Sequence, residues 1–202
     1  MHRSRNELVR KLRARTEEFA RTRRTVEGIL SFSENIREKE KTQLVDPEFH
    51  SCEFVGFLNE DETLVGCMLH PLARGNGDTD WRGLSFHGAM ACQGFFCRCY
   101  RELSPVQKQI ILSTVDDWFL YGLLISDADF LHSFFRVVEE NLIDPVKLLM
   151  PVASKLVHEF FQSLVPLDTI FVSLSSKLHS PSERKNAEEK INTLCSLLRR
   201  VA

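Results

Sequence analysis

The sequence has no apolar run long enough to cross a membrane, because no segment approaches the roughly 18 consecutive apolar residues that a spanning helix needs. Its first seven residues, Met-His-Arg-Ser-Arg-Asn-Glu, carry positive charge with no apolar run behind them. We therefore expect neither a secretory signal nor a membrane segment. These absences predict a cytoplasmic protein, and in that reducing compartment clustered cysteines are more often metal ligands or redox groups than disulfides.

Sequence signatures of common enzymes are also absent. The chain contains no nucleophile elbow, no Walker loop and no dinucleotide-binding fingerprint. The turn-rich segment Gly75-Asn-Gly77 lacks the helical pattern that would have to follow a phosphate-binding loop. No paired C-x2-C is present. The sequence identifies no substrate, and it favours a non-enzymatic role.

Net charge is small, at −2, but it is unevenly distributed. Residues 1–45 contain twelve Lys and Arg against seven Asp and Glu, which gives this segment a net charge of +5. Leu12, Phe19 and Val26 recur every seven residues, a spacing typical of one helix face. We expect a basic N-terminal arm of one long helix or two short ones, which packs on the body of the protein or on a second subunit. A protein partner or a homodimer is the partnership that this arm predicts. Mixed acidic residues and the lack of aromatic platforms disfavour nucleic acid.

Cysteine is concentrated in the middle of the chain. Five of the six cysteines and seven of the nine glycines lie between residues 52 and 99. Two short apolar runs flank the polar turn Asn59-Glu-Asp-Glu62, which predicts a β-hairpin with Cys52 at its start and Cys67 near its end. We expect a loop-rich cysteine module over residues 46–103, because glycine gives loops the backbone freedom to bring distant ligands together.

Helical signals dominate after this module. Ser104-Pro105 predicts a helix start, and that helix is expected to run to about Ile125. Asp127 can cap a second helix. A third begins at Asp144-Pro145, and Pro151 should kink or split it. We expect a fourth helix over residues 166–178 and a last one that begins at Ser180-Pro181. The predicted fold is therefore mainly α: a helical bundle over residues 104–202 with a small β-hairpin cysteine module, packed as one domain with the arm.

Four thiolates, or three thiolates and one imidazole, form a closed tetrahedral shell for zinc. Cysteines can equally hold an iron–sulfur cluster. Cys92-x4-Cys97 and Cys67-x2-His70 are plausible local pairs. Two alternatives remain open from the residues alone: these cysteines are small buried core side chains, or Cys97 and Cys99 form a thiol redox pair beside Arg98 and Arg101.

Three segments resemble a known family. They are Cys52-Glu-Phe-Val-Gly-Phe-Leu-Asn59, Val65-Gly-Cys-Met-Leu-His-Pro71 and Ala91-Cys-Gln-Gly-Phe-Phe-Cys97. Over residues 52–97 this pattern resembles the bacterial zinc- or iron-chelating cysteine-cluster domain family. The resemblance implies metal chelation, with Cys52, Cys67, Cys92 and Cys97 as ligands.

The family's opening run of closely spaced cysteines has no counterpart in this chain. Cys99, His70 and His87 are therefore reserve ligands. We expect a protein that binds zinc or iron, as a single ion or an iron–sulfur cluster. The alternatives are an iron–sulfur or thiol redox protein, and a helical interaction module in which the cysteines are incidental.

Overall fold

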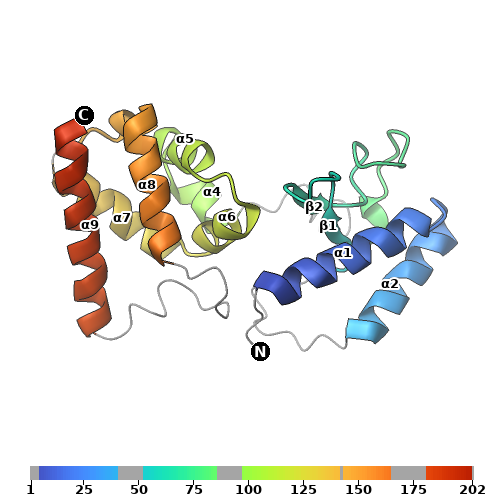
Figure 1. Ribbon diagram of the computed structural model, residues 1–202. Coiled ribbons are helices and arrows are strands. Elements are labelled where there is room, and N and C mark those ends of the chain that lie inside the picture. The colour runs from blue at the N-terminus through green and yellow to red at the C-terminus, as the bar shows by residue number, and fades with distance from the viewer. Residues whose placement is uncertain (1–4, 41–51, 86–96, 142, 165–180, 202) are drawn as a thin grey trace. The chain divides into compact units, whose positions relative to one another are not determined.

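The computed structural model of the chain describes residues 5–40, 52–85, 97–141, 143–164 and 181–201. By internal contacts the chain divides into two compact units, the first made mainly of Asn6–Phe95 and the second of Phe96–Ala202 together with His2–Arg5. Helices account for most of the described residues, and the strands form a single two-stranded sheet (Figure 1). The prediction of a mainly α protein with a small β-hairpin is confirmed. No helix among the described residues has the length and apolarity needed to span a membrane.

The first unit begins with two helices, α1 (Arg5–Arg21) and α2 (Val26–Glu40). The chain turns between them at Arg24, whose guanidinium lies 3.9 Å from the centre of the Phe19 ring and donates to the Phe19 carbonyl at 2.7 Å. Thr25 then begins α2, because its hydroxyl accepts a hydrogen bond from the Gly28 amide. These contacts select the two-helix alternative over a single long helix.

A β-hairpin completes the described part of this unit. Strands β1 (Val55–Phe57) and β2 (Val65–Cys67) pair antiparallel, with Val55 opposite Cys67. The Asn59 side chain closes the turn by accepting from the amides of Thr63 and Leu64. A short 3-10 helix, η1 (Arg82–Leu84), follows. The predicted hairpin is confirmed, and Cys52 precedes it as expected.

Aromatic side chains join the hairpin to the two helices. Phe54 is fully buried immediately before β1 and packs edge-on against Phe19 of α1, with ring centres 6.2 Å apart. It also contacts Phe32 of α2 at 5.5 Å. Ile29 and Leu69 belong to the same buried cluster. The core of the first unit therefore forms where α1, α2 and the residues flanking the hairpin meet.

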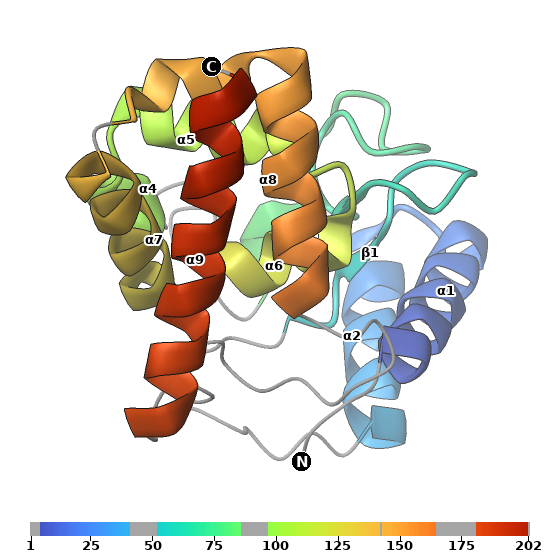
Figure 2. The same ribbon diagram turned by 60° about the vertical axis from the view of Figure 1, so that its left-hand side comes forward.

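The second unit is helical. Its elements are α4 (Arg98–Glu102), α5 (Pro105–Thr114), α6 (Trp118–Ile125), α7 (Ala128–Glu140), η2 (Pro145–Leu149), α8 (Pro151–Leu164) and α9 (Pro181–Val201). Helices α8 and α9 run side by side (Figure 2). Phe134 and Phe161 are fully buried at the centre, and Leu198 of α9 is buried as well.

The predicted caps and breaks are mostly found. Asp127 caps α7 by accepting from the Phe130 amide, and Pro151 separates η2 from α8. One boundary is wrong: the single helix expected from Pro105 to Ile125 is two helices, α5 and α6. Asp117 caps the start of α6 by accepting from the Leu120 amide, and His158 hydrogen-bonds the Thr114 carbonyl at the end of α5. The helix predicted at 166–178 lies outside the described residues.

Candidate functional site

Cys52 and Cys67 come to the same end of the hairpin although fourteen residues separate them. Cys52 lies just before β1, and its carbonyl accepts from the Val55 amide at 3.3 Å. Val55 in turn pairs with Cys67, the last residue of β2. Both cysteines are half-buried and pack against the core cluster of the first unit. The hairpin register therefore accounts for the position of both residues at this end of the hairpin.

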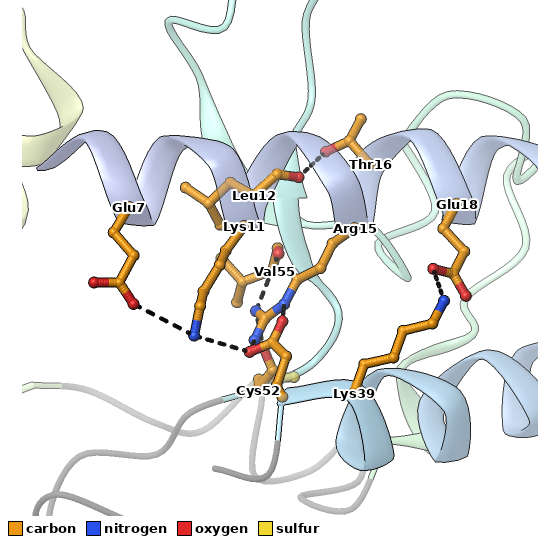
Figure 3. Close-up of polar contacts among 10 residues, drawn as sticks. Glu7, Lys11, Leu12, Arg15, Thr16, Glu18, Lys39, Cys52 and Val55 are labelled. Carbon is orange, nitrogen blue, oxygen red and sulfur yellow. Dashed lines mark hydrogen bonds and ion pairs between the residues drawn. The ribbon is translucent and has the colours of Figure 1, made fainter. Parts of the chain in front are cut away.

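A buried arginine fixes the backbone at Cys52. Arg15 of α1 is only 7% exposed, and its Nη1 donates to the Cys52 carbonyl at 3.0 Å. The remaining edge of the guanidinium forms a bidentate pair with Glu40, at 2.6 and 2.7 Å. Lys11 lies 4.0 Å from the same Glu40 carboxylate (Figure 3). The cysteine is thus connected through one guanidinium to the middle of α1 and the end of α2.

The residue after Cys52 is held by α2. Glu53 is 6% exposed, and its carboxylate accepts hydrogen bonds from the Ser33 hydroxyl and from Arg37. A buried carboxylate is costly unless it is paired and hydrogen-bonded, and here both conditions are met. Since Phe54 is buried in the aromatic core, three consecutive residues beginning at Cys52 have fixed positions.

Cys67 and His70 lie at the two ends of a tight turn, in which the His70 amide donates to the Cys67 carbonyl at 3.2 Å. The buried Asn76 side chain supports this turn by donating to the carbonyls of Met68 and His70, at 2.9 and 2.8 Å. Gly75 and Gly77 stand on either side of Asn76, and their φ angles of 85° and 56° are backbone conformations that other residues rarely adopt. The glycines predicted to shape the loop therefore place Asn76 rather than a ligand.

The His70 ring already has a role within the loop. Its Nδ1 accepts a hydrogen bond from the Leu72 amide at 3.2 Å, so in the neutral ring the proton is on Nε2. Coordination of a metal through either nitrogen would remove that acceptor or require the other tautomer. This arrangement favours sulfur over His70 as a ligand.

The next cysteines differ sharply from each other. Cys97 is half-buried and immediately precedes α4, whereas Cys99 is 3% exposed within that helix. Burial raises the pKa of the Cys99 thiol to about 11, with smaller contributions from Cys97, Asp127 and Glu102. Cys99 is therefore a protonated core thiol at neutral pH, while Cys97 is accessible. Cys195 is likewise buried in α9, where burial raises its pKa.

The predicted ligand set is only partly within the described residues. Cys92 and His87 lie outside them. Among the residues that are described, no three His, Cys, Asp or Glu side chains gather closely enough to hold a metal ion. The structure places Cys52 and Cys67 at the same end of the hairpin. Two half-buried thiols on fixed backbone suit a thiophilic metal, which requires further ligands from elsewhere.

Arg15 and Asn76 are the residues that sequence reasoning did not assign to this site. Arg15 interrupts the apolar stripe of α1, and a charged residue on a buried face indicates a buried partner. Asn76 stands between two glycines in the loop, which suggested only a turn. The sequence therefore signalled a buried partner for Arg15 but not for Asn76, and the bonded residues lie 37 and 6–8 positions away along the chain.

No family model, curated protein or solved structure gives a significant match to this chain.

Proposed function

We propose that the protein binds zinc or iron through Cys52, Cys67, Cys92 and Cys97 as thiolates. The observation that carries this proposal is the placement of Cys52 and Cys67 at one end of the hairpin, half-buried, on backbone held by side chains of α1, α2 and Asn76. Metal sites gain affinity when their ligands are fixed before the ion arrives, because less conformational entropy is lost on binding.

The proposed metal has a structural or storage role. Four thiolates close the tetrahedral shell of zinc and leave no position open for a substrate. In structural zinc sites the binding free energy, on the order of 10 kcal/mol, adds directly to folding. We infer that the metal stabilises the loops around residues 50–99, which contain few regular elements among their described residues.

Elemental analysis and a visible spectrum of protein purified without oxygen test the proposal. We expect about one zinc, or iron with visible absorption if an iron–sulfur cluster is bound. Cys67→Ser should lose the metal, because it removes a ligand. Cys195→Ala is the matched control and should retain it, since Cys195 lies in the core of the second unit.

Wild-type protein that folds normally without stoichiometric metal would overturn the proposal. That outcome would favour the interaction module, for which exposed Val26 and Leu30, one turn apart on α2, offer an apolar contact. The spectrum also separates a zinc protein from an iron–sulfur protein. A thiol redox pair at Cys97 and Cys99 is disfavoured, because the raised pKa keeps Cys99 protonated and the thiolate is the reactive form.

A further inference from the structure

We propose that Arg15 is the residue that positions Cys52 for metal binding, with Glu40 as the anchor of its guanidinium. This inference rests on the proposed metal-binding function and adds to it a residue that touches no metal. Arg15 belongs to α1, far from the cysteine-rich segment in sequence. It makes the direct contact between that helix and the backbone of a proposed ligand (Figure 3).

The geometry requires the planar fork of arginine. Nε and Nη2 contact the two oxygens of Glu40, while Nη1 turns to the Cys52 carbonyl at 3.0 Å and the Val55 carbonyl at 3.5 Å. Guanidinium donors have fixed relative directions, so satisfying Glu40 also aims Nη1 at the turn before β1. A lysine ammonium is a single point charge and cannot reproduce both sets of contacts.

Burial makes this contact hard to replace. Arg15 and Glu40 have side-chain exposures of 9% and 10%, so neither group exchanges its partner for bulk water at low cost. Without Nη1, the Cys52 carbonyl would lose a charge-assisted hydrogen bond on the residue that carries the thiol. The thiol would then sample more positions, and metal affinity would fall.

The same helix provides a matched control. Arg13 makes a bidentate pair with Glu62, at 2.6 and 2.7 Å, which also joins α1 to the hairpin region. That pair is exposed, and its described contacts do not include a cysteine. Arg13→Lys therefore makes the same substitution as Arg15→Lys and also removes a bidentate guanidinium–carboxylate pair, but it leaves the contact to Cys52 in place.

The experiment compares full-length wild type, Arg15→Lys, Glu40→Gln and Arg13→Lys. Zinc affinity is measured by competition with a chromophoric chelator. In the metal-free proteins the alkylation rate of Cys52 is measured by mass spectrometry of peptides, with Cys67 as the internal reference. Thermal unfolding followed by circular dichroism identifies a temperature at which every variant is folded, and the comparison is made at that temperature. Glu40→Gln keeps Arg15 and removes the charge of its anchor, so it tests the same inference if Arg15→Lys folds poorly.

We expect zinc affinity to fall by about 10- to 100-fold in Arg15→Lys and Glu40→Gln, as for other residues that orient metal ligands. Arg13→Lys should stay within about threefold of wild type. Alkylation of Cys52 relative to Cys67 should rise on the order of tenfold when the turn opens more often.

Two outcomes are distinct. If wild type takes up zinc and Arg15→Lys and Glu40→Gln bind it equally well, the role of Arg15 is wrong and the metal site stands. If wild type takes up no zinc or iron, the proposed function fails, and this inference fails with it as a statement about metal binding. The alkylation ratios then report only whether Arg15 orders Cys52.

Discussion

Cys97 and Cys99 are separated by a single residue, Arg98, and differ in burial. Cys97 is accessible before the first turn of α4, whereas Cys99 points into the core of the second unit. A buried thiol resists ionisation because the thiolate loses its hydration. The candidate ligand Cys97 and the core side chain Cys99 therefore differ because Cys97 precedes α4, whereas Cys99 lies on its buried face.

The pKa of Cys99 predicts a pH dependence of stability. In the unfolded chain the thiol ionises near pH 9, and in the folded protein near pH 11. The folded state thus holds a proton that the unfolded state releases between these values, so stability falls as pH rises from 9 to 11, by on the order of 2 kcal/mol. Below pH 9 both states are protonated and the contribution is fully present.

Urea unfolding of metal-free wild type and Cys99→Ala at pH 8.5 and 10.5 checks this expectation. Tyr121 contributes to the loss in both proteins, because its pKa is raised by burial and, to a smaller extent, by Cys97 and Cys99. Cys99→Ala should lose less stability over this interval than wild type. Equal losses would show that the thiol ionises as readily in the folded state as in the unfolded chain.

At the scale of elements, α1 and the hairpin meet at Gly56. Thr16 of α1 links the two, because its hydroxyl accepts from the Phe57 amide and donates to the Leu12 carbonyl, both at 2.8 Å. A Cβ on Gly56 would lie 2.6 Å from that hydroxyl and 2.5 Å from the sulfur of Met68. Glycine is therefore required for close packing of the helix on β1.

Gly56→Ala should lower the free energy of unfolding by about 2 kcal/mol, the range expected when a tightly packed contact is overfilled. Gly83→Ala is the control in the same unit, since a Cβ there would meet nothing within 4 Å. It should change stability by less than about 0.5 kcal/mol. Chemical denaturation of both variants measures the difference, and equal stabilities would mean that α1 can move away from β1 at little cost.

At the scale of the whole molecule, each compact unit contains one of the two tryptophans. Trp81 packs on the core cluster of the first unit, and Trp118 begins α6 in the second. Trp81→Phe and Trp118→Phe therefore give proteins whose remaining tryptophan reports on a single unit.

Removal of metal by a chelator should lower the melting temperature reported by Trp81 by roughly 10 °C, if the metal is present at about 100 times its dissociation constant. Thermal unfolding followed by fluorescence of the two variants, with and without chelator, makes the measurement. Trp118 shows in parallel how far the effect extends into the second unit. A Trp81 transition unaffected by the chelator would contradict a structural metal bound by Cys52 and Cys67.

Most helices and the hairpin could be predicted from residues that lie close together in the sequence. Ser104, Asp127 and Asp144 each precede a helix whose amides they cap, and two apolar runs around Asn59 form the hairpin. These features depend on residues a few positions apart, so they can be read from the chain. The cysteine clustering belongs to the same class, although the ligand set derived from it remains a prediction.

Tertiary structure decided what depends on distant partners. The break at Asp117 was missed although Asp116 and Asp117 interrupt the apolar pattern there, because the Thr114 carbonyl is satisfied by His158, 44 residues later. Arg15 could be seen as an anomaly on a buried face, but only folding places Glu40 and the Cys52 carbonyl around it. Likewise, only the folded structure shows that the Cys99 thiol is buried while Cys97 is half-buried, because burial of a thiol is set by the helices packed over it.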